Sequence, residues 1–119
     1  MANIQKTYAL ILGIVLALVG IIGFFDNPLV GANGFFMVNA AQSVLHLIAA
    51  AFGIYVGTKG EGPGYNMSLG WIGIVLGVLG FIPTVDQLLA DWLAINMNIT
   101  ILHLVIGIVS LGVYYGVKD

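Results

Sequence analysis

Four long runs of apolar residues constrain this chain more than any other feature of its sequence. They cover approximately residues 8–25, 38–57, 65–82 and 94–117. About 20 helical residues are needed to cross the roughly 30 Å hydrocarbon core of a bilayer, and each run is close to that length. Only 7% of the 119 residues are charged, against about 25% in soluble domains. The sequence therefore predicts an all-α integral membrane protein, with four transmembrane helices forming one domain over residues 1–119.

The segments between the runs carry turn and interface signals. Residues 27–34 contain the turn dipeptides Asn-Pro and Asn-Gly, and residues 58–64 are too rich in glycine and proline for regular structure. Before the fourth run, Thr84 is placed to cap a short amphipathic helix carrying Asp86 and Asp91. We expect that helix to lie along the membrane surface.

The lysines predict the orientation of the chain. Four spans place Lys6, Lys59 and Lys118 on one side of the membrane and leave the other side without a cationic side chain. The positive-inside rule then predicts cytoplasmic N- and C-termini. The formal charge of −2 and the absence of a basic patch argue against a nucleic-acid partner. Because the chain has no cysteine, disulfides and thiolate sites are excluded.

A polar pattern in the second run recurs in the fourth. Asn39, Ser43 and His46 are followed 57 positions later by Asn96, Thr100 and His103, and these two histidines are the only ones in the chain. The same offset aligns the first run with the third. We expect two helix-pair repeats, about 8–57 and 65–117, related by a pseudo-two-fold axis along the membrane normal.

Small residues form stripes at helical spacing along the runs. The glycines predicted to pack helices together are Gly13, Gly20, Gly23, Gly70, Gly73, Gly77, Gly80 and Gly107. Small residues let membrane helices approach closely, so the stripes predict one compact bundle.

The three polar residues of each repeat share one helical seam, and three interpretations of that seam are open. Asn, Ser or Thr, and His could satisfy one another's hydrogen bonds as a structural polar layer. Alternatively, His46 and His103 could be ligands of haem b or of a chlorophyll-type pigment. A small-solute or proton pathway is a third hypothesis. A metal site is not predicted, because two imidazoles without an intramembrane carboxylate leave zinc short of ligands.

Two motifs resemble a known family. They are Gly80-Phe81-Ile82-Pro83 and Asn96-x-Asn98-x4-His103-Leu-x2-Gly107. On these residues the chain resembles the small four-helix bacterial membrane proteins catalogued as domain of unknown function 4383. The resemblance covers nearly the whole chain and implies a bacterial-type cytoplasmic membrane and the same fold, without a chemistry. The first repeat departs from the pattern, since Asp26-Asn27-Pro28 follows Gly23-Phe24 and Ala50 stands where the second repeat has Gly107.

The sequence contains no phosphate-binding loop, nucleophile elbow or zinc-protease signature. We therefore expect a non-enzymatic structural or accessory component of a membrane assembly, without a cofactor. The expected partners are the lipid bilayer and either further copies of the chain or other membrane-protein subunits.

Overall fold

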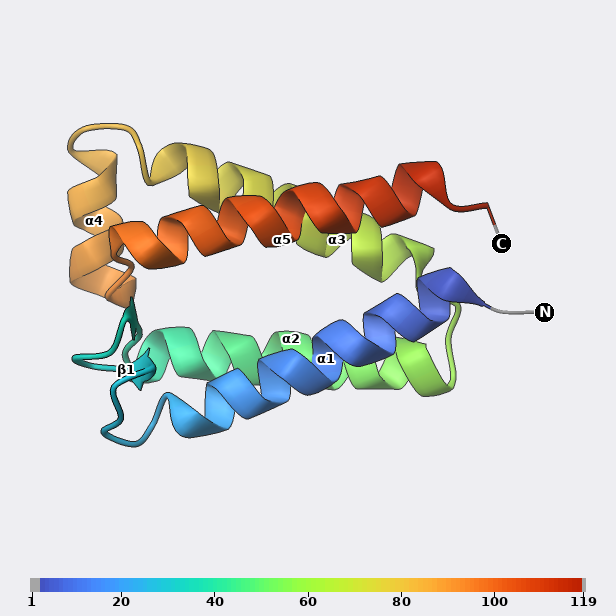
Figure 1. Ribbon diagram of the computed structural model, residues 1–119, viewed down its shortest axis with the longest axis horizontal. Coiled ribbons are helices and arrows are strands. Elements are labelled where there is room, and N and C mark those ends of the chain that lie inside the picture. Colours follow the sequence, from blue (N-terminus) through green and yellow to red (C-terminus); the bar gives the residue numbers. More distant parts are fainter. Residues whose placement is uncertain (1–2, 119) are drawn as a thin grey trace.

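The computed structural model describes residues 3–118, and within them the chain forms five helices and one pair of short strands. The elements are α1 (Ile4–Ile22), β1 (Val30–Gly31), β2 (Phe36–Met37), α2 (Ala40–Thr58), α3 (Pro63–Leu79), α4 (Val85–Leu93) and α5 (Met97–Gly116). The four longer helices follow the long axis of the molecule, whereas α4 lies across one end, opposite both termini (Figure 1). We call these two ends the α4 end and the terminal end.

Three of the helices, α1, α2 and α5, are long and apolar enough to cross a membrane. The prediction of a helical membrane protein is therefore confirmed. The third predicted run forms α3, which is also apolar but has 17 residues, corresponding to about 25 Å of helix. α3 packs along α5 for much of its length (Figure 1).

The helix boundaries differ from the apolar runs where local capping decides them. α1 begins at Ile4, before the first run, because the Asn3 side chain accepts a hydrogen bond from the Lys6 backbone N–H at 3.0 Å. α3 begins with Pro63 in the first turn, where its missing N–H costs nothing. The prediction that the Thr84 side chain caps α4 is wrong. Its side chain makes no capping hydrogen bond, and its backbone has a positive φ of 75°.

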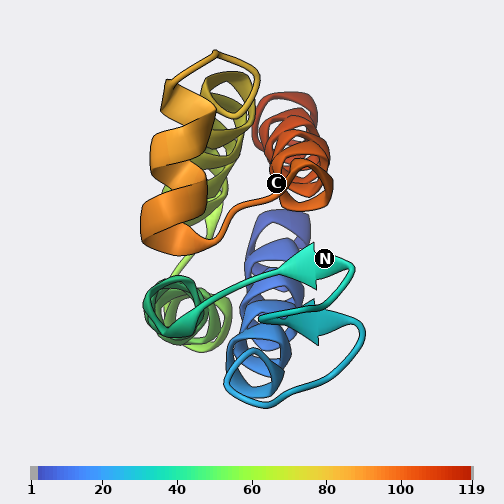
Figure 2. The ribbon, with the colours of Figure 1, turned by 90° about the vertical axis from the view of Figure 1, so that its left-hand side faces the viewer.

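The long helices form two tight pairs, α1 with α2 and α3 with α5 (Figure 2). Glycine allows their backbones to meet: a Cβ added to Gly13 would lie 2.7 Å from the backbone nitrogen of Ile54 on α2. In the second pair, a Cβ on Gly107 would lie 2.7 Å from the backbone nitrogen of Ile74 on α3. The same crowding, under 3.0 Å, occurs at Gly13, Gly20, Gly23, Gly70, Gly73, Gly77, Gly80 and Gly107.

Two buried hydrophobic clusters join one helix pair to the other. At the α4 end, Val30 and Val38 pack with Ile95 and Ile99, and the α4 side chains Leu89 and Leu93 cover them. Toward the terminal end, the α1 residues Ala9 and Leu12 pack against Tyr65 of α3. The pairs are thus held together at two levels along their length.

The loop between α1 and α2 is organised by one side chain, that of Asn27. Its Nδ2 donates to the carbonyl oxygens of Ile22 and Phe25, each at 2.9 Å, and its Oδ1 accepts from the Val30 N–H at 2.7 Å. These bonds shape the turn that the sequence predicts there. They also place β1 beside β2, with which it pairs in parallel.

Candidate polar site between the two helix pairs

Asn39 and Asn96 lie at the starts of α2 and α5, and each caps its own helix. Asn39 Oδ1 accepts a hydrogen bond from the Gln42 N–H at 2.9 Å, and Asn96 Oδ1 accepts one from the Ile99 N–H at 3.0 Å. An asparagine in this position satisfies one of the backbone donors that a helix leaves open at its first turn. Capping of the following helix therefore accounts for an asparagine at each of these two positions.

The same two side chains also bond across to the segment that joins the two helices of the other pair, α4 in one case and the α1–α2 loop in the other. Asn39 Nδ2 donates to the carbonyl of Trp92 at 3.0 Å, and Asn96 Nδ2 donates to the carbonyl of Phe35 at 3.1 Å. The two acceptors, like the two donors, are 57 positions apart in the chain. The N-terminal half and the C-terminal half of the chain thus each give one such bond and receive one. We call these two bonds the crossed asparagine bonds.

Ser43 and Thr100 face the inside of their own helix pair rather than the opposite pair. Ser43 is fully buried, and its hydroxyl lies against Gly23 at the end of α1. Thr100 lies in the same way against Gly80 at the end of α3. The Ser43 hydroxyl has no hydrogen-bond partner among the described residues. Both residues therefore act in the close approach of paired helices.

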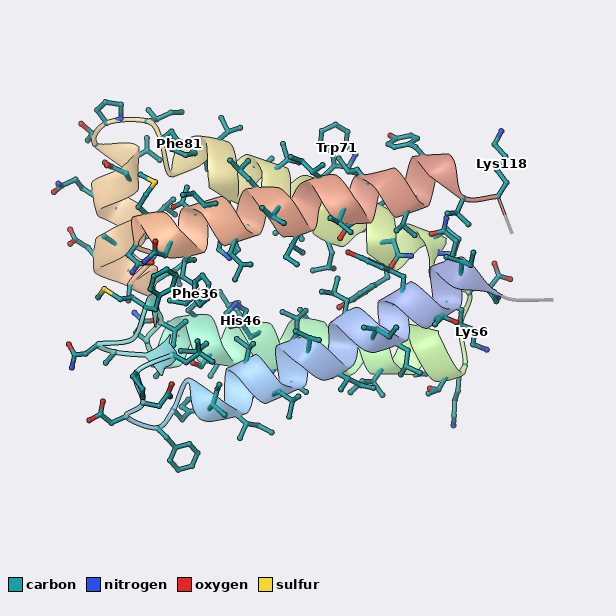
Figure 3. All side chains as sticks on the ribbon, in the orientation of Figure 1. Lys6, Phe36, His46, Trp71, Phe81 and Lys118 are labelled. Carbon is teal, nitrogen blue, oxygen red and sulfur yellow. The ribbon has the colours of Figure 1, made fainter. Side chains whose placement is uncertain are left out.

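His46 and His103 have a different environment. Both side chains are partly buried, and His46 extends from α2 toward the space between the helix pairs (Figure 3). Both Nδ1 atoms are buried and lack a hydrogen-bond partner within the described chain.

These contacts bear on the expectation that Asn, Ser or Thr, and His satisfy one another along each seam. The asparagines are occupied at helix starts and in the crossed asparagine bonds, while Ser43 and the two histidine Nδ1 atoms have no protein partner. The mutual network is therefore not formed by the described residues. The side chains point in different directions around each helix. The asparagine amides point toward α4 and the α1–α2 loop, whereas Ser43 and Thr100 point into their own helix pairs.

A second set of polar contacts, at the terminal end, joins the pairs through tyrosines. The Tyr8 and Ser110 hydroxyls of α1 and α5 lie 2.6 Å apart, within hydrogen-bond distance. Tyr65 of α3 donates to the carbonyl of Ala49 on α2 at 2.8 Å, and its hydroxyl sits against Gly53. Tyr65 follows Tyr8 by 57 positions, and Ser110 follows Gly53 by the same offset.

Two amide side chains near the terminal end, those of Gln5 and Asn66, were not predicted from the sequence to have a role. Gln5 Nε2 donates to the carbonyl oxygens of Val113 and Val117, at 2.8 and 3.0 Å, where α5 ends. Asn66 is fully buried and donates to Gln5 Oε1 at 2.8 Å. The Val117 carbonyl lies beyond the last turn of α5, where the helix supplies no N–H for it, so Gln5 of α1 provides that partner. The Val113 carbonyl accepts from the Val117 N–H as well as from Gln5. The only available signal was two amide side chains inside otherwise apolar helices.

Two hollows on the surface of the described chain have defined linings, and neither lining includes a histidine. One, of about 280 Å³, is lined by Asn3, Gln5, Glu61 and Pro63 at the terminal end. The other, of about 350 Å³, is lined by Ala51, Phe52 and Tyr55 on α2. Within the described chain, His, Asp and Glu side chains form no group of three that could hold a metal ion.

Comparison with known proteins identifies the family. A family sequence profile described as "Domain of unknown function (DUF4383)" matches residues 6–116, which is nearly the whole chain. No curated protein and no solved structure matches the chain. Of the residues that carry the resemblance, the Gly80 to Pro83 motif forms the turn between α3 and α4, and Asn96 to Gly107 forms the first half of α5. The chain belongs to the DUF4383 family.

Proposed function

We propose that this chain is a non-enzymatic structural or accessory component of a membrane assembly in a bacterial-type cytoplasmic membrane. The proposal rests on one observation: the chain's own side chains bury only a small part of each candidate membrane span. In α1, α2 and α5, between 22% and 28% of the residues of the membrane-crossing stretch are buried. Large apolar side chains cover the remaining surface, including Leu18, Phe52 and Ile108, each at least 60% exposed. Such a surface requires lipid or partner helices.

In this proposal all four long helices span the membrane, and the two helix pairs are copies of one duplicated unit. The crossed asparagine bonds support the duplication, because donors and acceptors both repeat at an offset of 57. The tyrosine contacts at the terminal end support it at a second level. Contacts exchanged in this way follow from a pseudo-two-fold axis along the membrane normal. The 17 residues of α3 lie at the lower limit of known transmembrane helices.

The experiment is purification in a mild detergent, with the mass of the complex measured by light scattering and native mass spectrometry. We expect a homo-oligomer or a complex with other membrane-protein subunits. A stable solitary monomer without a co-purifying protein would contradict the proposal.

Because the chain has no cysteine, single-cysteine variants can locate the contact surface in native membranes. Ile11→Cys, Phe52→Cys, Ile72→Cys and Ile108→Cys each test one exposed helix face. Ala50→Cys is the matched control, since Ala50 is 2% exposed within the chain. In a homo-oligomer at least one exposed position forms a disulfide between copies, and Ala50→Cys forms none. In a hetero-assembly the exposed position instead cross-links to another subunit when treated with a bifunctional reagent.

A further inference from the structure

The short helix α4 is the least anchored helix of the described chain. Among the helices described, it is the only one without a buried residue. Its two ends continue into α3 and α5, which form one helix pair, so the backbone ties α4 to that pair alone. It nevertheless reaches across to the start of α2 in the other pair (Figure 2). Its position against α2 therefore depends on non-covalent contacts.

Two hydrogen bonds and one apolar contact hold α4 in that position. Asn39 Nδ2 donates to the carbonyl of Trp92 at 3.0 Å, and Gln42 Nε2 donates to the carbonyl of Leu93 at 2.6 Å. Both acceptors lie in the last turn of α4, where a helix leaves its carbonyls without internal partners. The side chains of Leu89 and Leu93 pack, partly buried, against the cluster that contains Val38. We call these contacts the α4 clasp.

The backbone is strained on both sides of α4. Thr84, before the helix, has φ 75° and ψ −47°, and Ala94, after it, has φ 58° and ψ 27°. They are the only non-glycine residues of the described chain with a positive φ. A β-branched residue rarely adopts such a backbone, and glycine is the usual residue in the conformation of Ala94. The cost of two such conformations is of the same order as the gain from two hydrogen bonds.

We propose that α4 is a releasable strap, which moves away from α2 by rotation about Thr84 and Ala94 when the α4 clasp opens, and which closes again across the two helix pairs. Release breaks the bonds from Asn39 and Gln42, and it lets both strained residues return to a negative φ. It also uncovers the buried cluster around Val38, so the contact between the helix pairs becomes accessible at the α4 end.

The test measures distances between spin labels on α4 and α2, because a chain without cysteine accepts labels at chosen positions. Gln87→Cys on α4 and Ala41→Cys on α2 are exposed sites and form the strap pair of labels. Leu18→Cys on α1 and Val44→Cys on α2 lie within one helix pair and form the control pair. In nanodiscs, pulsed electron paramagnetic resonance should give two distance populations for the strap pair and one for the control pair. Dilution with unlabelled chain removes distances between copies.

Variants should change the ratio of released to closed molecules in both directions. Asn39→Asp keeps the cap of α2 and loses the bond to Trp92, so it should raise the ratio about fivefold, the equivalent of one hydrogen bond. Thr84→Gly and Ala94→Gly relieve the strain, and each should lower the ratio about fivefold. Ala90→Gly is the matched control, because it makes the same substitution at an exposed position inside α4. It should not lower the ratio.

Three results would overturn the strap. One is a single distance population for the strap pair in both the unmodified chain and Asn39→Asp. Another is an equal change in the control pair, because the whole protein would then be opening. The third is a ratio that responds to Thr84→Gly and Ala94→Gly as it does to Ala90→Gly. The unmodified chain and Asn39→Asp decide the matter even where a glycine variant fails to fold. None of these outcomes affects the oligomer measurement that tests the proposed function.

Discussion

At the scale of single residues, Asn39 and Asn96 each do two things with one side chain. The Oδ1 atom caps the residue's own helix, and the Nδ2 atom donates to a carbonyl of the segment that joins the helices of the other pair. These roles are separable by chemistry, because aspartate retains the capping oxygen and lacks the amide donor. The crossed asparagine bonds can therefore be removed without removing the caps.

We expect Asn39→Ala to lower the free energy of unfolding by about 1–3 kcal/mol, from the lost cap and the lost bond to Trp92 together. Asn39→Asp should lose only the bond, about 1 kcal/mol. Asn96→Ala should likewise lose a cap and a bond, but Asn96→Asp should cost less than Asn39→Asp, because the Phe35 carbonyl still accepts from Asn98 Nδ2 at 2.8 Å. The measurement is unfolding in mixed detergent micelles followed by circular dichroism. Equal stability of the Ala and Asp variants would show that the cap contributes nothing.

At the scale of the elements, each helix pair depends on glycines that leave no room for a side chain. Gly13→Ala would place a Cβ 2.7 Å from a backbone nitrogen of α2, and Gly107→Ala would do the same against α3. Because backbone atoms must move, we expect each change to cost about 1–3 kcal/mol in unfolding free energy.

Gly112→Ala is the internal control for the glycine pairs, since nothing lies within 4 Å of the Cβ it would add. Alanine is the better helix former, so this change should be neutral or stabilising by up to about 1 kcal/mol. Thermal unfolding of the three variants in one detergent compares them directly. If Gly13→Ala and Gly112→Ala unfold alike, α1 and α2 do not approach each other closely enough at Gly13 to exclude a Cβ.

At the scale of the whole molecule, the distribution of charge predicts the orientation in the membrane. Lys6 and Lys118 lie at the terminal end (Figure 3), and Lys59 lies at the end of α2 that connects there. At the α4 end, the described charged side chains are those of Asp26, Asp86 and Asp91. The terminal end should therefore face the cytoplasm.

Cysteine accessibility in intact cells checks this orientation. A membrane-impermeant maleimide should label Gln87→Cys, on the exposed side of α4, without permeabilisation. Glu61→Cys, in the exposed loop between α2 and α3, should be labelled only after the membrane is opened. Labelling of Glu61→Cys alone in intact cells would reverse the orientation, and immediate labelling of both would exclude four spans.

Much of the element structure was predictable because it depends on local composition. Apolar runs of helical length indicate membrane helices whatever their partners are, and the spacing of Gly13, Gly20 and Gly23 already defines one face of α1. The short helix α4 was also predictable, but its Thr84 cap was not formed. The loop leading into α4 holds Thr84 at a positive φ, and a capping residue normally has an extended backbone.

The sequence by itself determined that this chain forms apolar helices in a membrane, which residues line their close contacts, and to which family it belongs. Only the tertiary structure decided what the polar side chains do. The partners of Asn39, Asn96 and Gln5 lie more than 50 residues away in the chain, so helical periodicity carries no information about them. Which way each amide points depends on how the two helix pairs face each other. In that same arrangement His46 Nδ1 and His103 Nδ1 have no hydrogen-bond partner among the described residues.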